Sequence, residues 1–194
     1  MNTFCAKETV PEGFRYSALI ALIHNRKLRK LLIRLSLVLT VLGIALGLLI
    51  QPKLGLLFSG GLWRVLLRFA AIAVLIALYM VAHEAVHGAL MWLYSRKKPH
   101  FGFKMGCAYA GSQMYFGKNA YLSIALAPLV LWGAALTVIS LMVPADWFWV
   151  LWGVQLTNLS GSAGDLYVFG RVLKKPDNVL VQDNGIVMHL HEHP

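Results

Sequence analysis

Two histidines and a glutamate are the residues of this sequence whose types and spacing best suit chemistry. His83 and His87 are four residues apart, and Glu84 follows the first of them. In a helix this spacing places both imidazoles on one face, where they can bind a single Zn²⁺. Glu84 then lies beside the metal and can act as general base towards water. The motif predicts a hydrolytic zinc site with two histidine ligands and a catalytic glutamate.

A third ligand is needed, because a catalytic zinc site has three protein ligands and one open position. Asp165 is the only acidic residue well inside another apolar segment. It precedes Arg171 by six residues, about 9 Å of helix, and His87 precedes Arg96 by nine, about 13 Å. The carboxylate and the histidines therefore lie at similar depth if both arginines mark one membrane surface. We predict Asp165 as the third ligand, and Asn158, two turns earlier, as a group that hydrogen-bonds substrate or a ligand.

The segments that must position these residues are membrane helices. The chain is 58% hydrophobic and 13% charged, about half the charged fraction of a soluble domain. Four apolar segments have the roughly 20 residues that a span requires; they are 31–50, 69–94, 120–143 and 145–169. We predict an all-α membrane protein with about four transmembrane helices in one bundle. Ionisable residues inside a span are costly and indicate function, although a polar patch that binds a neighbouring helix is the alternative.

The distribution of positive charge predicts the topology and argues against nucleic acid as a partner. The net charge is +10, but the basic residues cluster at 26–34 before and at the start of the first apolar segment, at 96–118 between the second and third, and at 171–175 after the fourth. Positive residues stay on the cytoplasmic side. We therefore expect a multi-pass protein of the plasma (inner) membrane with both termini and the 95–118 loop in the cytoplasm. Arg64 and Arg68 do not fit this pattern, and we expect them to reach the outer interface.

Outside the apolar segments the chain has two candidate β-hairpins. We divide it into a cytoplasmic N-terminal tail over 1–30, a transmembrane domain over 31–172 and a cytoplasmic C-terminal tail over 173–194. The glycine- and aromatic-rich segment 101–117 is a short hairpin or a re-entrant segment at the membrane surface, with a plain surface loop as the alternative. The run 179–190 contains an Asn-Gly pair between apolar stretches, which is a strong hairpin signal.

Two further features of the tails carry expectations. Residues 16–30 are compatible with a helix lying in the membrane interface. In the C-terminal tail His189, His191 and His193 alternate, so that in a strand they share one face. Such a tract can bind metal weakly, and a solvated tail is the alternative.

The motifs together resemble a known family. The sequence HEAVHG at 83–88, followed by LAPL at 126–129 and NLSGSAGDL at 158–166, resembles the membrane zincin peptidases. That family is related in pattern to the site-2 protease class of intramembrane metalloproteases. The resemblance covers about 60–180. Site-2 proteases usually have a proline where Ser160 and Gly161 stand here.

The resemblance implies roles for individual residues. His83, His87 and Asp165 correspond to the zinc ligands, Glu84 to the catalytic base, and Asn158 to a residue near the substrate. Site-2 proteases often have a β-hairpin after the first catalytic helix, and an exposed strand edge can bind an extended peptide by strand addition.

The predicted function is a zinc-dependent, membrane-embedded peptidase. It would hydrolyse peptide bonds of membrane or membrane-proximal substrates with metal-activated water and a glutamate base. Its partners would be the lipid bilayer and a peptide or membrane-protein substrate. A catalytically silent zinc-binding interaction protein is one alternative, but Glu84 is not needed for binding metal. A metal-handling protein that uses the histidine tail is the other, although no inverted repeat is visible.

Overall fold

The computed structural model describes residues 6–22, 25–104 and 107–193. The chain forms two compact units. The first comprises Met1–Leu32, His83–Pro128 and Gly164–Pro194, and the second comprises Ile33–Ala82 and Leu129–Ala163.

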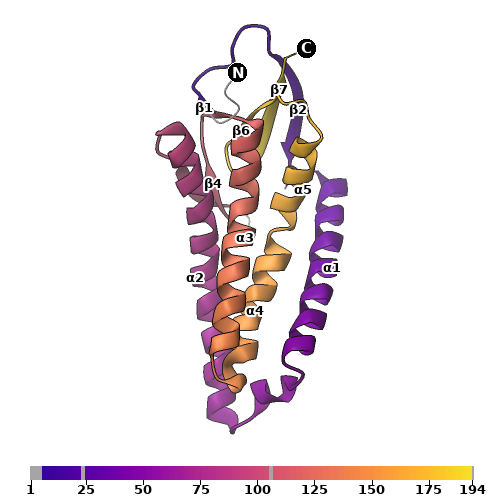
Figure 1. The fold of residues 1–194 in the computed structure, drawn as a ribbon, viewed down its shortest axis with the longest axis vertical. Coiled ribbons are helices and arrows are strands. Elements are labelled where there is room, and N and C mark those ends of the chain that lie inside the picture. The colour runs from indigo at the N-terminus through magenta and orange to yellow at the C-terminus, as the bar shows by residue number, and fades with distance from the viewer. Residues whose placement is uncertain (1–5, 23–24, 105–106, 194) are drawn as a thin grey trace. The chain divides into compact units, whose positions relative to one another are not determined.

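The first unit is built around a five-stranded antiparallel sheet. Its strands, in order across the sheet, are β1 (Ala6–Lys7), β5 (Tyr115–Gly117), β6 (Leu180–Asp183), β7 (Val187–Glu192) and β2 (Arg15–Ala21). The N-terminal strand β2 and the C-terminal strand β7 lie side by side, as Figure 1 shows near the two chain ends. Both segments that were expected to be tails thus supply strands. The expected interfacial helix is wrong at its start, because a strand occupies that stretch.

Both predicted hairpins are present. Strands β3 (His100–Lys104) and β4 (Cys107–Gly111) pair antiparallel in a separate two-stranded sheet. The second hairpin consists of β6 and β7, which are joined by a turn around Asn184 and Gly185. Gly185 has a φ of +82°, a left-handed conformation that glycine adopts without strain. The Asn-Gly pair therefore forms the turn that these residue types predict.

One face of the five-stranded sheet packs on helices. Phe116, Val181 and Leu190 from three neighbouring strands are completely buried. They join a single apolar cluster with residues from the beginning of α3 (Lys118–Met142) and from α5 (Ala163–Leu173). Burying this face stabilises the sheet, which as an isolated hairpin would be marginal.

Among the described residues, three helices are long and apolar enough to cross a membrane: α1 (Arg26–Ile50), α2 (Leu62–Ser95) and α3. The fourth expected span, 145–169, is instead divided into α4 (Ala145–Gly161) and α5. The break falls at Ser162, in a run of serine and glycine residues with poor helix propensity. The predicted bundle of four spans thus becomes three long helices followed by a broken pair.

In the second unit, Arg68 joins the connection between α1 and α2 to the start of α4. Its guanidinium is only 3% exposed and donates hydrogen bonds of 2.8 Å to the carbonyls of Leu56 and Ser59, around the short 3-10 helix η1 (Leu54–Phe58). It also forms an ion pair of 2.8 Å with Asp146. The expectation that Arg68 reaches the interface is therefore wrong. Its charge is satisfied inside the protein, where carbonyls and a carboxylate offset the cost of burial.

Candidate metal centre

The first unit brings together the three residues that the sequence predicts as metal ligands. His83 and His87 are buried on one face of α2, with ring centroids 5.0 Å apart, and Asp165 lies in the first turn of α5. The Nε2 atom of His83 is 3.2 Å from Oδ2 of Asp165, and Nε2 of His87 is 3.5 Å from Oδ1. Within the described residues this is the only group of three or more histidine, cysteine or acidic side chains whose ligand atoms all lie within 4.8 Å.

The distances between these donor atoms suit zinc. Zinc binds histidine nitrogen and carboxylate oxygen at about 2.0–2.1 Å, so neighbouring donors of a tetrahedral site are about 3.3 Å apart. The two histidines approach different oxygens of Asp165, at 3.2 and 3.5 Å, and the ligand atoms of all three residues lie within 4.8 Å of one another, close to that spacing. Two imidazoles and one carboxylate also form a ligand set found in catalytic zinc sites, which leaves a fourth position open. The residues therefore fit a zinc ion.

His87 has the hydrogen bond expected of a metal ligand. Its Nδ1 lies 2.9 Å from the carbonyl oxygen of Ile124 in α3. A carbonyl can only accept, so Nδ1 carries a proton, and Nε2, which faces the aspartate, is the nitrogen available to bind a metal. Histidine ligands of metals usually donate their second nitrogen in this way, and the bond fixes both ring orientation and tautomer.

A proline makes that carbonyl available. In an α-helix the carbonyl of residue 124 would accept from the backbone N–H of residue 128. Residue 128 is Pro128, which lies inside α3 and has no N–H. The Ile124 carbonyl therefore lacks its usual helical donor, and the imidazole of His87 occupies the place. The proline of the LAPL sequence thus contributes indirectly to the metal centre.

Glu84 stands beside the three ligands but makes a different contact. Its Oε2 accepts a hydrogen bond of 2.8 Å from the backbone N–H of Ala110, in strand β4. The carboxylate is therefore oriented by the β3–β4 hairpin, which leaves its second oxygen for another partner. This arrangement suits a base that stands next to a metal.

The structure places Asn158 in the second unit, in a buried polar network. The side chain is fully buried on α4, and its Oδ1 accepts from the hydroxyl of Tyr79 at 2.8 Å. Its Nδ2 donates to the carbonyl of Leu129 and to Gln155, at 3.3 and 3.4 Å. The role of Asn158 near the substrate stays a prediction.

The histidines of the C-terminal tail lie in the sheet. His189 and His191 are on β7, and both rings contact the ring of Tyr16 on the neighbouring strand, with centroids 6.2 and 5.5 Å away. Neither belongs to a group of three ligands in the part of the chain that the structure describes. The rings contribute instead to contacts between strands.

The sequence did not predict the two backbone groups that contact the side chains of the site. The N–H of Ala110 and the carbonyl of Ile124 hold Glu84 and His87, yet a backbone group has no residue-type signal. For Ile124 a signal exists in Pro128 four residues later, because a proline inside a helix frees the carbonyl one turn before it. For Ala110 only the expectation of a hairpin after the second helix pointed to the region.

A comparison with known proteins finds a family that covers the part of the chain containing this site. Residues 76–180 match a family described as "Putative zincin peptidase". The matched range contains His83, Glu84, His87 and Asp165. No curated protein and no solved structure matches the chain.

Proposed function

We propose that this chain, which belongs to the putative zincin peptidase family, is a membrane-embedded zinc peptidase that cleaves membrane or membrane-proximal polypeptides. The observation that carries the proposal is that four neighbouring side chains make two different kinds of contact. Three of them point donor atoms at one another, whereas Glu84 stands beside them and bonds a strand. A purely structural zinc site has no use for such a carboxylate, since structural sites are closed by four ligands.

The ligands and the base divide the chemistry between them. His83, His87 and Asp165 would hold the metal, and bound zinc would lower the pKa of water and polarise the scissile carbonyl. Glu84 then takes a proton from the attacking water and passes it to the nitrogen of the departing amine. The Ala110 N–H keeps one carboxylate oxygen in place during both transfers.

The sheet supports an even number of membrane crossings. It contains strands from before α1, from between α2 and α3, and from after α5. A bilayer cannot pass through a hydrogen-bonded sheet, because no lipid-exposed sheet edge is tolerated in hydrocarbon. If α1, α2 and α3 each cross, the chain must cross back before β6, and α4 with α5 is the segment available. We therefore retain four crossings, with the fourth made by a broken helix.

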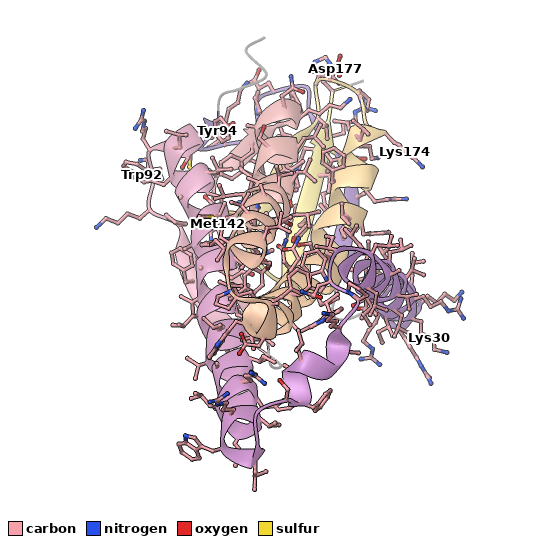
Figure 2. The ribbon with its side chains drawn as sticks, turned by 60° about the horizontal axis from the view of Figure 1, so that its bottom comes forward. Lys30, Trp92, Tyr94, Met142, Lys174 and Asp177 are labelled. Atoms are coloured by element: carbon pink, nitrogen blue, oxygen red, sulfur yellow. The ribbon has the colours of Figure 1, made fainter. Side chains whose placement is uncertain are left out.

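The charges near the sheet support its placement on the cytoplasmic side. Exposed basic residues begin α1, and the side chain of Lys30 points away from that helix in Figure 2. Lys174 extends from the chain just beyond α5. Under the positive-inside rule this end faces the cytoplasm, so both termini and the metal centre would be on the cytoplasmic side of the plasma (inner) membrane.

The β3–β4 hairpin is the proposed place for substrate. One edge of β4 pairs with β3, and on its other edge the N–H of Ala110 points to Glu84. From Ala110 onwards that edge is covered by the turn at 183–185, where the carbonyl of Asp183 accepts from the N–H of Ser112. A peptide in extended conformation along the part of the edge before Ala110 would lie beside the base. Strand addition uses main-chain hydrogen bonds and also keeps the scissile bond out of a helix, where it is shielded from attack.

Removal and return of the metal test the function. The protein, purified in detergent, is incubated with a single-span peptide and with an extended soluble peptide, each labelled at both ends. We expect cleavage of at least one, loss of cleavage after chelation, and recovery when one equivalent of zinc is restored. Chelation without effect on cleavage would contradict the proposal, and so would zinc binding at the site without cleavage of either peptide.

A further inference from the structure

A buried carboxylate lies at the turn between β6 and β7, outside the metal centre. Asp183 accepts a hydrogen bond of 2.6 Å from the hydroxyl of Tyr121 at Oδ2, and one of 2.8 Å from the N–H of Gly185 at Oδ1. Burial raises the pKa of Asp183 above its ordinary value, and the two donors oppose that rise. Both oxygens thus have defined partners, one on helix α3 and one within the turn.

The turn lies directly against the β3–β4 hairpin. The carbonyl of Asp183 accepts from the N–H of Ser112 at 2.7 Å. At Gly111 a Cβ atom would come within 2.4 Å of the carbonyl carbon of Asn184, and at Gly185 one would come within 2.9 Å of the carbonyl oxygen of Ala110. Backbone therefore packs on backbone, so a shift of the turn must move the strand.

Both contacts of Asp183 lead to residues of the metal centre. The strand that rests on the turn contains Ala110, whose N–H holds Glu84. Tyr121 lies three residues, about one helical turn, before Ile124, whose carbonyl accepts from His87. One carboxylate is therefore connected to the base through the hairpin and to a ligand through α3.

We propose that Asp183 is a positioning residue: through the Asp183-Asn184-Gly185 turn and Tyr121 it fixes the Glu84 carboxylate and the His87 imidazole. The inference rests on the proposed peptidase function. It extends the functional part of the chain beyond the family match, which ends at residue 180. A small displacement of a catalytic group is enough to matter, since about 1 Å can cost roughly a hundredfold in rate.

The test compares isosteric variants with a matched surface control. Asp183→Asn keeps the shape but offers one acceptor oxygen instead of two, and Tyr121→Phe removes only the hydroxyl. Asp177→Asn makes the same chemical change in the same segment, at a side chain that is 90% exposed. Each purified variant is measured for zinc content, for kcat and KM separately, and for amide hydrogen exchange of the peptide containing Ala110.

We expect Asp183→Asn and Tyr121→Phe to bind one zinc and to lower kcat by about ten- to a hundredfold with KM nearly unchanged. Exchange at Ala110 should accelerate in both, and the Asp177→Asn control should match the wild type. Unchanged kcat and unchanged exchange in Asp183→Asn would overturn the proposal, even if Tyr121→Phe were affected. If the wild type cleaves nothing, the proposed function fails, but the exchange of Ala110 still decides whether Asp183 positions the strand.

Discussion

Replacing Glu84 by glutamine separates catalysis from metal binding. In the wild type the Ala110 N–H donates to the Glu84 carboxylate at 2.8 Å. Glutamine has nearly the same shape and keeps one carbonyl oxygen, so it can still accept this hydrogen bond. The bond changes from charge-assisted to neutral, which costs about 1 kcal/mol of stability. Alanine would instead leave the buried N–H without a partner, at about 1–3 kcal/mol. Glu84→Gln is therefore the informative variant.

The effect on the reaction should be much larger than the effect on folding. An amide cannot take a proton from water, and the loss of a general base typically lowers the rate by about 10²–10⁴. That corresponds to about 3–5 kcal/mol in the activation barrier. The three proposed ligands are not altered, so zinc content should stay at one per chain.

The assay measures cleavage, zinc content and melting temperature of detergent-purified protein. Glu192→Gln is the matched control, because it makes the same substitution on β7, where the carboxylate pairs with Lys175 at 2.7 Å. The control should keep full cleavage. A Glu84→Gln protein that cleaves within twofold of wild type would refute the assigned role of the glutamate, and one that loses zinc would show that Glu84 is itself a ligand.

Three other predictions concern groups around the centre and the two units. Pro128→Ala gives the carbonyl bonded by His87 a competing helical donor, so zinc affinity should fall by about tenfold without loss of thermal stability; unchanged affinity by isothermal titration would contradict this. Arg68→Met should lower the free energy of unfolding in detergent by about 3–5 kcal/mol. Asp146→Asn, at a side chain that is 39% exposed, should lower it by about 1 kcal/mol or less. Equal losses would be inconsistent with an Arg68 side chain that is held mainly by backbone carbonyls. The hydrogen bond from Lys175 lowers the pKa of Glu192, so the stabilisation by this pair is present at neutral pH and is lost as pH falls through the lowered pKa. The melting temperatures of wild type and Glu192→Gln should therefore differ at neutral pH and converge once the pH is below that lowered pKa; a difference that does not change with pH would contradict this.

Local patterns in the sequence were enough to predict that His83, His87 and Asp165 lie together. The His83–His87 spacing defines one helix face, and the depth of Asp165 relative to the nearest arginines predicts that its carboxylate meets that face. Both hairpins also follow from local signals, such as the Asn-Gly pair at 184–185. Helix periodicity and turn chemistry act over a few residues, so a sequence displays them directly.

Pairings between distant segments could not be predicted in the same way. Strand β2 pairs with β7, about 170 residues later, and its residues 15–21 show no strict alternation that would distinguish a strand from an interfacial helix. The break at Ser162 was masked by the high overall hydropathy of 145–169, although the serines and glycines nearby were visible. Strand formation here depends on the partner strands and the shared core, which composition does not reveal.

Zinc stoichiometry in ligand variants is the most direct test of the central claim. Metal content is measured on detergent-purified wild type, His83→Ala, His87→Ala and Asp165→Ala, with the His189→Ala/His191→Ala double variant as the control in the sheet. We predict one zinc per chain in the wild type and in the control, and loss of tight zinc binding in each of the three ligand variants, because each loses one of three donors. Full zinc in Asp165→Ala, or loss of zinc only in the control, would contradict the assignment of His83, His87 and Asp165 as the metal centre.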